Sequence, residues 1–260
     1  MFLDLYIISV ACSIGVVLGS FLNVLILRIH DDEPWFSGRS RCPHCDHQLG
    51  WKELIPVISY LHLRGKCRHC GSRISLQYPL VELLSGLIVA GVVAWFGVSF
   101  EGVVIALLGI LLPGIFVSDI RFLEIPNFFS FLAIILACIY QVVWGADSFV
   151  ALITASVLGT FFFLAQFIVT RGKGIGFGDV YLGLLMGLML GWPSLLYAIL
   201  IAYVGGSTIA LSLVALRVIS RKSPVPLGVF LVPALVITFI WEKDIVEFFN
   251  SFLGLGFFYA

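Results

Sequence analysis

Two aspartates stand at the edges of apolar segments, where a membrane-protein sequence rarely keeps a charge. Asp179 closes the motif Gly176-Phe177-Gly178-Asp179 at the start of one segment, and Asp119 lies at the end of an earlier one. An ionised carboxyl at the end of a membrane helix is costly, so its presence suggests a function. Two carboxyls that share one proton carry out aspartic peptide hydrolysis. We therefore predict that Asp119 and Asp179 form a catalytic pair.

Each aspartate alone also has a structural interpretation. Asp119 could form an interfacial ion pair with Arg121 or be a helix-terminal charge, and Asp179 could cap the helix that begins beside it. We expect one helix to end at Asp119 and the next to begin after Pro126. Glu124 is a rival carboxylate, but its place in a short loop favours a solvated side chain.

The glycines before Asp179 favour a site over a simple cap. Gly172, Gly174, Gly176 and Gly178 alternate through this loop, and glycine lets a backbone approach closely and adopt positive φ. A cap needs neither property, whereas an extended substrate backbone that approaches an aspartate needs both. Gly176 and Gly178 are therefore expected to be the supporting site loop.

The composition requires a membrane to hold these elements. The 260 residues are 60% hydrophobic and only 12% charged, and the mean hydropathy is +1.10. A water-soluble core could not bury so much apolar surface, so we predict an all-α polytopic membrane protein. The formal net charge of zero carries no information about acidic partners, and we expect no nucleic-acid ligand.

About eight transmembrane helices are predicted. The first, 5–27, is too long for a signal-peptide core and lacks a basic segment before it, so we interpret it as an uncleaved span. The stretch 180–217 is too long for one span, and we expect a break at Trp192-Pro193. The other seven apolar segments are 79–97, 102–118, 127–144, 149–170, 180–192, 194–217 and 225–241.

The basic residues predict the orientation in the membrane. Alternate loops contain 14 of the 15 Lys and Arg residues, and only Lys243 lies on the other side. By the positive-inside rule the basic loops are cytoplasmic and the N-terminus is outside. Asp119 and Asp179 then lie at the cytoplasmic ends of their helices. The predicted organisation is a first helix (1–27), a cytoplasmic loop (28–78) and a seven-helix catalytic domain with a short C-terminal tail (79–260).

The large loop contains two matched cysteine pairs. Cys42-x2-Cys45 and Cys67-x2-Cys70 are separated by 21 residues, which is typical of two knuckles that share one zinc ion. Four thiolates leave no open position, so the expected role is a structural, zinc-ribbon-like module. His44 and His69 lie inside the knuckles, but the ligand set is complete without them. Disulfides or a redox-active pair fit a reducing cytoplasm less well.

The order of these motifs resembles the bacterial type IV prepilin peptidases, the family of leader peptidase and N-methyltransferase membrane aspartyl proteases. The resemblance covers nearly the whole chain. It rests on Gly19–Val24, the cysteine pairs, Ile55–Leu61, Ile74–Glu82, Asp119 with Ile125-Pro126, Gly176–Asp179 and Pro226–Leu231. Two positions depart from the family pattern, because Tyr181 replaces its usual lysine and Asn127 replaces its usual aspartate.

The resemblance implies that type IV prepilins and pseudopilins are cleaved at the cytoplasmic face of the bacterial inner membrane. It further implies that the new N-terminus is methylated by S-adenosylmethionine, and that the processed proteins assemble into pili or act in type II secretion. No soluble-type glycine-rich dinucleotide loop is present. Glu82 and Gly86 are the candidates for methyl transfer, while a Glu82 ion pair with Arg73 or Lys66 is the structural alternative.

Two other classes of function remain open from the residues. The chain could be a non-catalytic zinc-ribbon scaffold of a secretion or pilus machine, its aspartates merely interfacial. It could also be a thiol-redox membrane enzyme that uses the paired cysteines. The oligomeric state is not indicated by the sequence.

Overall fold

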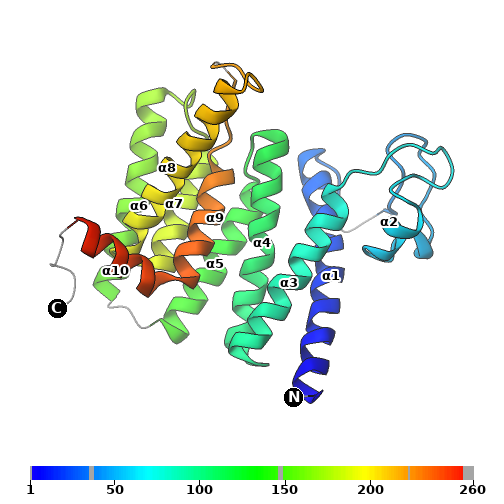
Figure 1. The fold of residues 1–260 in the computed structure, drawn as a ribbon, viewed down its shortest axis with the longest axis horizontal. Helices are drawn as coiled ribbons and strands as arrows, with labels where there is room; N and C mark the ends of the chain where they lie inside the picture. Colours follow the sequence, from blue (N-terminus) through cyan, green and yellow to red (C-terminus); the bar gives the residue numbers. More distant parts are fainter. Residues whose placement is uncertain (1, 35–37, 146–148, 222, 254–260) are drawn as a thin grey trace. The chain divides into compact units, whose positions relative to one another are not determined.

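The computed structural model describes residues 2–34, 38–145, 149–221 and 223–253, and all regular elements in these ranges are helices (Figure 1). Six of the helices are long and apolar enough to cross a membrane. The chain is thus an all-helical, multi-pass membrane protein, as its composition predicts. Lys222 and residues 254–260 of the expected C-terminal tail lie outside the described residues.

The chain divides into two compact units, Met1–Gly114 and Ile115–Ala260. In the first unit α1 packs against α3 through small residues, with Gly15 and Gly19 of α1 facing Ser85. This spacing permits close packing of membrane helices. The elements of this unit are α1 (Phe2–His30), a 3-10 helix (Trp51–Glu53), α2 (Ile58–His62) and α3 (Gln77–Phe96), while α4 (Phe100–Phe122) runs through the boundary.

In the second unit the short helix α7 is enclosed by its neighbours. It packs against α5, α6 and α9, while α8 contacts α9, and α10 contacts both α8 and α9. Most of α7 is buried, including Asp179 in its first turn. The helices are α5 (Asn127–Trp144), α6 (Phe149–Thr170), α7 (Phe177–Leu190), α8 (Ser194–Ala215), α9 (Gly228–Ile240) and α10 (Glu242–Leu253).

The predicted break at Trp192-Pro193 is confirmed, since α7 ends at Leu190 and α8 begins at Ser194. The predicted end of α4 at Asp119 is wrong, because the helix continues to Phe122 and the Leu123 N–H still bonds to the Asp119 carbonyl at 2.9 Å. Asp119 therefore lies within the last turn. Glu242–Leu253, to which the sequence analysis assigned no element, forms a helix.

Two of the eight apolar helices are shorter than a full span. At 1.5 Å rise per residue, the 14 residues of α7 and the 13 of α9 reach only about 20 Å, against a hydrocarbon core of about 30 Å. By length, therefore, six helices qualify as spans. Both short helices begin beside a candidate site motif, Gly176–Asp179 for α7 and Pro226–Val229 for α9.

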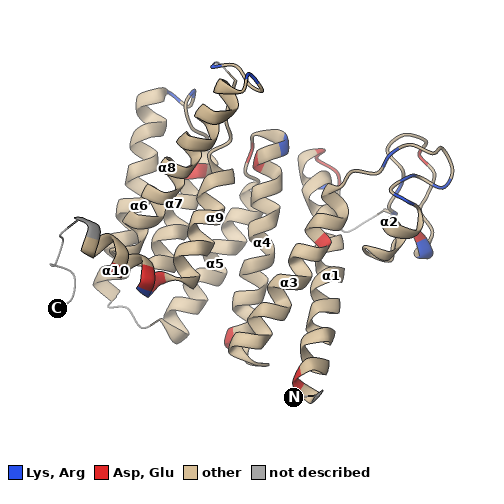
Figure 2. Ribbon diagram, in the orientation of Figure 1, with Lys and Arg blue, Asp and Glu red and all other residues tan. Residues whose placement is uncertain are grey.

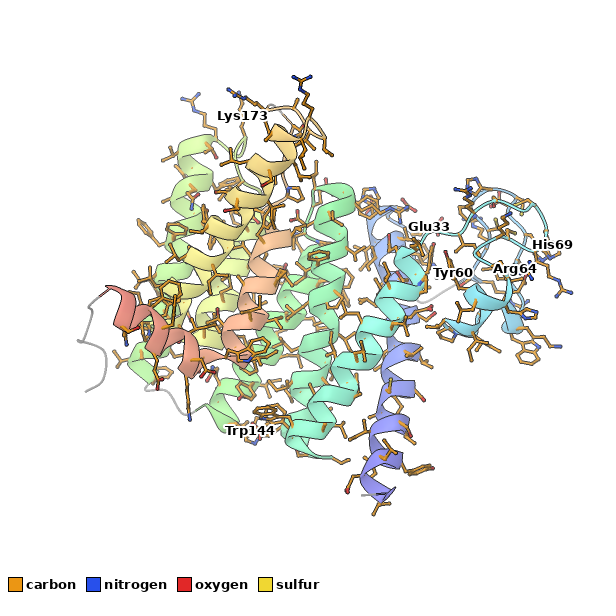
Figure 3. All side chains as sticks on the ribbon, viewed as in Figure 1. Glu33, Tyr60, Arg64, His69, Trp144 and Lys173 are labelled. Atoms are coloured by element: carbon orange, nitrogen blue, oxygen red, sulfur yellow. The ribbon has the colours of Figure 1, made fainter. Side chains whose placement is uncertain are left out.

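Charge in the second unit is concentrated at the helix ends (Figure 2). Basic side chains gather where α6 passes to α7 and α8 passes to α9. Lys173 and Trp144, labelled in Figure 3, mark opposite ends of this helical bundle. The apolar length between the two ends carries few charges, as a bilayer requires.

Candidate active site and metal centre

Asp119 is anchored to the beginning of α9. Its side chain is buried, and the Val229 N–H donates a hydrogen bond of 3.1 Å to Oδ2. The free N–H groups and the dipole at a helix N-terminus favour a carboxylate. Within the described part of the chain Asp119 has no ion-pair partner. The hydrogen bond from Val229, and not an ion pair with Arg121, therefore holds its side chain.

Asp179 lies at the third position of α7 and does cap it. Its Oδ2 accepts a hydrogen bond of 3.0 Å from the Gly176 N–H, so the predicted role of Asp179 as a helix cap is confirmed. The cap uses one of the two carboxylate oxygens. Among the described residues Oδ1 has no hydrogen-bond donor, which leaves it available for chemistry.

Ile125 brings the two aspartate motifs together. A Cβ at Gly178 would lie 2.6 Å from the Ile125 Cβ, and one at Gly228 would lie 3.2 Å from its Cδ1 and 2.7 Å from Asp119 Oδ2. Glycine is therefore required at both positions for the close approach. Through Ile125 the segments that carry Asp119 and Asp179 therefore meet within the second unit.

The loop glycines have different roles. Gly178 meets Ile125, whereas a Cβ at Gly176 would have nothing nearer than 3.8 Å, so no contact within the protein explains the glycine there. Sequence reasoning gave no role to Ile125, Gly228 or Val229, although their segments are part of the family resemblance. No local pattern could have linked α9 to Asp119, because the contact is distant in sequence.

Glu124 and Tyr181, which lie near the two aspartates in sequence, take no part in the contact around Ile125. Glu124 is exposed, in agreement with a solvated carboxylate. Tyr181, at the position of the family lysine, packs its ring at 5.2 Å from Phe177 and 5.0 Å from Phe131. An aromatic contact therefore stands where the usual pattern has a cation.

The four cysteines of the loop converge on one point. Each pair sits in a small hairpin, closed by the bridges Arg41–Gln48 and Lys66–Arg73. All four Sγ atoms lie within 4.8 Å of one another, none is in a disulfide, and Cys42 Sγ and Cys70 Sγ are 3.9 Å apart. Tetrahedral zinc with Zn–S bonds of about 2.3 Å needs sulfurs about 3.8 Å apart. The cluster fits a zinc ion.

Hydrogen bonds prepare these thiols to act as ligands. The backbone N–H of His44 is the main cause that lowers the pKa of Cys42 to about 6. The Ser72 hydroxyl, 3.0 Å from Cys70 Sγ, lowers the pKa of Cys70. A metal binds the thiolate, so these two shifts favour metal binding. Against the hydrogen bond from the His47 backbone, burial and the neighbouring thiols raise the pKa of Cys45 to about 12, and this thiol must lose its proton to the metal.

Glu82 is buried in α3 and binds the loop backbone. Its Oε2 accepts a hydrogen bond of 2.7 Å from the Val57 N–H, and the Ser20 hydroxyl lies beside it. Among the described residues Glu82 forms no ion pair with Lys66 or Arg73. Val57 has φ +61°, a costly conformation for a β-branched residue, and the Glu82 bond helps to hold it.

Gly86, the other methyl-transfer candidate, lies in the α1–α3 contact. A Cβ there would lie 2.6 Å from Val16 Cγ2 and 3.1 Å from the Cys12 carbonyl oxygen. Close helix packing therefore accounts for this glycine. Its role in methyl transfer stays a prediction.

Fold and site together define a polytopic membrane protein with a buried pair of carboxyls and a four-cysteine loop module. Two family models match it: "Bacterial Peptidase A24 N-terminal domain" over residues 13–96 and "Type IV leader peptidase family" over residues 106–211. Relatives that align over most of this chain, and over most of their own length, are named as leader peptidases. The chain therefore belongs to the type IV leader peptidase family.

Three relatives named "Prepilin leader peptidase/N-methyltransferase" illustrate the similarity. The Myxococcus xanthus protein is 36% identical over 203 residues, 76% of this chain and 60% of that protein. The Burkholderia pseudomallei protein is 34% identical over 256 residues, 86% and 82% of the two chains. The Stutzerimonas stutzeri protein is 32% identical over 279 residues, 94% of each. No solved structure matches the chain.

Proposed function

We propose that this chain cleaves the leader peptide of type IV prepilins and pseudopilins, and then methylates the new N-terminus with S-adenosylmethionine. The observation that carries the proposal is the pair of buried carboxyls, Asp119 and Asp179, which Ile125 and two glycines bring together in the second unit. Membership of the leader peptidase family and the names of the relatives support it.

The hydrolysis needs one proton shared between the two aspartates. The ionised carboxyl takes a proton from water as the water oxygen attacks the scissile carbonyl carbon, and the protonated carboxyl donates to the carbonyl oxygen. Collapse of the tetrahedral intermediate returns a proton to the leaving amine and restores the shared proton. The pair acts as one coupled unit, so neither carboxyl is assigned the proton. The Val229 and Gly176 N–H groups hold the carboxyls in position.

An extended substrate would approach along the glycine loop before α7. The backbone at Gly176 is extended, with φ −80° and ψ 161°, and a Cβ there would meet only Asp179 Oδ2 at 3.8 Å and the Gly178 nitrogen at 3.9 Å. A leader segment that lies alongside this loop would bring its peptide bond to Asp179. Gly176 thus supports the substrate side of the site, whereas Gly178 supports the contact with Ile125.

In the membrane we propose eight spans. The helices α7 and α9 are the short ones, and the ends of these helices that carry site residues lie within the bilayer and do not reach its surface. The positive-inside rule then puts the basic loops and both aspartates at the cytoplasmic face of the bacterial inner membrane. The concentration of basic side chains at one end of the second unit is consistent with this orientation (Figure 2).

The loop module would hold one structural zinc ion through Cys42, Cys45, Cys67 and Cys70. The ion would contribute folding free energy to a loop that has little apolar core of its own. With four thiolate ligands it has no open position for substrate, so it takes no part in the hydrolysis.

For methyl transfer, S-adenosylmethionine supplies an electrophilic methyl group to the new amine. The first unit has a groove of about 440 Å³ between α1 and the segment Trp51–Pro56, and Ser20 lines it beside Glu82. The groove is open to solvent, and Trp51 and Phe21 are among its lining residues, so the adenine of the methyl donor would stack on an aromatic side chain here. Glu82 would accept hydrogen bonds from polar groups of the methyl donor or from the amine.

The alternatives have less support. A scaffold has no need for two buried carboxyls whose motifs meet at Ile125, and the family relationship does not favour it. A redox enzyme needs thiol pairs that open and close independently, whereas these four sulfurs form one cluster.

The deciding experiment incubates purified protein in detergent or liposomes with a purified prepilin, with and without S-adenosylmethionine. The expected products are a mature pilin without the methyl donor and a pilin heavier by one methyl group with it, both resolved by intact mass spectrometry. Intact prepilin in both reactions would reject the peptidase, and cleavage without methylation would reject only the second activity.

A further inference from the structure

A second group of metal-binding side chains lies in the loop module, apart from the four cysteines. The ligand atoms of His47, Glu53 and His69 lie within 4.8 Å of one another. The two imidazole rings are in contact, with their centroids 3.4 Å apart and their planes tilted by 31°. His69, labelled in Figure 3, belongs to the second cysteine knuckle, and His47 follows the first.

The folding of the two knuckles determines where these histidines lie. The Cys42 N–H bonds to the His47 carbonyl at 3.0 Å, which closes the first hairpin, and the Cys67 N–H bonds to the Ser72 carbonyl at 2.8 Å in the second. His47 therefore lies at the base of one hairpin and His69 within the turn of the other.

Glu53 completes the group with one oxygen to spare. Its Oε2 accepts a hydrogen bond of 2.8 Å from the Gly50 N–H, which fixes the carboxylate at the start of the 3-10 helix. Its Oε1 is fully buried and has no hydrogen-bond partner among the described residues. A buried carboxylate oxygen without a partner is unfavourable, and a cation beside it removes that cost.

We propose that His47, Glu53 and His69 form a second zinc site, distinct from the cysteine site. Two imidazole nitrogens and one carboxylate oxygen are ligands suited to zinc, and two imidazoles disfavour calcium or magnesium. Three protein ligands leave a fourth position for water, so this site exchanges its ion more readily than the four-thiolate site. It goes beyond the proposed function, which needs one structural ion only.

The geometry requires a rearrangement of the side chains. Zinc bonds to N and O of about 2.0–2.1 Å put tetrahedral donors about 3.4 Å apart and the centroids of two imidazole ligands about 5 Å apart. The donor atoms, now within 4.8 Å, must therefore close on the ion while the two rings, now 3.4 Å apart, rotate away from each other. His69 is exposed and free to make such a rotation, while Glu53 is held by Gly50.

A simple contact between the two rings, or a hydrogen-bonded ion pair with Glu53, explains the group less well. The ring contact gives no role to the Glu53 Oε1, and no hydrogen bond joins that oxygen to either ring within the described chain. His44 is the natural comparison, because it holds in the first knuckle the position that His69 holds in the second. It is not part of the group.

The test measures the zinc content of the full-length protein in detergent after equilibration with zinc and removal of free ion. Two equivalents per chain are expected for the wild type, one for His47→Ala, Glu53→Gln or His69→Ala, and two for the control His44→Ala. One equivalent in the wild type, or two in His47→Ala and Glu53→Gln, would overturn the proposal.

Cobalt substitution separates the two sites by their donors. Cobalt at the cysteines gives an intense sulfur-to-metal charge-transfer band, whereas cobalt at His47, Glu53 and His69 gives only weak visible bands. In Cys42→Ser the charge-transfer band is expected to weaken while the weak bands persist, and in His69→Ala the reverse. If every band disappears together in His69→Ala, in protein that is still folded by circular dichroism, a separate site is excluded.

Discussion

Asp119 is held by Val229, 110 residues further along the chain, through a 3.1 Å hydrogen bond from the Val229 N–H to Oδ2. Gly228, the preceding residue, lies so close that a Cβ there would be 2.7 Å from the same oxygen. The first turn of α9 thus both donates to Asp119 and leaves it space. The segment Pro226–Val229 acts as a positioning element of the proposed active site.

Gly228→Ala is therefore expected to displace the Asp119 carboxylate and reduce prepilin cleavage at least tenfold, which corresponds to about 1.4 kcal/mol of barrier. The matched control is Gly205→Ala in α8, where a Cβ would meet nothing within 4 Å. The control should cleave normally and be as stable as the wild type or up to about 1 kcal/mol more stable. Cleavage rates and thermal unfolding check both, and equal activity of the two variants would remove the positioning role.

The second prediction concerns Asp119 and Asp179 as one catalytic unit. Asn at either position keeps the size but cannot share the proton, so each single variant should abolish cleavage. The double variant should be scarcely worse than either single one, because residues that act as a unit are not additive. The proteins should still insert and fold, since removal of a charge from a buried membrane position reduces a desolvation cost. Cleavage by the wild type should fall at both acidic and alkaline pH.

Glu124→Gln is the control for this pair, because the exposed Glu124 carboxylate is the nearest rival in the sequence. Near-normal cleavage by Asp179→Asn in liposomes, with loss in Glu124→Gln, would transfer the catalytic role to Glu124. Circular dichroism and detergent gel filtration confirm that each variant is folded before its rate is compared.

The features that the sequence predicts are those set by short-range patterns. Apolar runs predict the eight hydrophobic helices, and the two cysteine pairs predict the cluster, because each pattern is written within a few tens of residues. The turn chemistry of Trp192-Pro193 predicts the break between α7 and α8.

The remaining features depend on contacts distant in sequence. The hydrogen bond between Val229 and Asp119, and the packing of Ile125 against Gly178, follow from how α4, α7 and α9 meet. Nothing near Glu82 in sequence indicates that it binds the backbone of Val57. The helix end at Phe122 was also missed, because a charged residue ends an apolar run without ending a helix.

The third prediction concerns the cysteine zinc site. Cys42→Ser should lose the zinc ion of the cysteine cluster and lower the thermal stability of the loop module, since this binding free energy contributes to folding. Cys138→Ser, an exposed thiol in α5, is the matched control and should keep its zinc. Unchanged metal content in a Cys42→Ser/Cys67→Ser double variant would contradict the assignment.

Zinc retention by the cysteine cluster is also expected to depend on pH, which is a separate measurement. The pKa of Cys42 is lowered to about 6, chiefly by the His44 N–H, whereas the pKa of Cys45 in the same cluster is raised to about 12. Protons compete with the metal for each thiolate. Zinc should be retained at neutral pH and released to a chelator increasingly as the pH falls.

Orientation in the membrane is tested by labelling. If the basic loops are cytoplasmic, single cysteines introduced in a background without Cys12 and Cys138, at Lys173 and at Lys243, should react differently with an impermeant maleimide applied to whole cells. The Lys243 position should be labelled from outside, and the Lys173 position only after permeabilisation, as the positive-inside rule requires. Labelling of the Lys173 position in intact cells would invert the arrangement and move the proposed active site to the outer face.

The last prediction separates methyl transfer from cleavage. Glu82→Gln keeps an oxygen that accepts the Val57 N–H but loses the charge, so the loop conformation is preserved while a charged contact with the methyl donor or the amine is lost. Methylation of mature pilin should fall at least tenfold, which corresponds to about 1.4 kcal/mol of barrier. Leader cleavage should stay within about twofold of wild type, because Glu82 is not part of the aspartate pair. Glu101→Gln, in the first turn of α4, is the matched control and should change neither rate. If cleavage and methylation fall together in Glu82→Gln, Glu82 is a structural support of the loop and not a group of the methyl-transfer site.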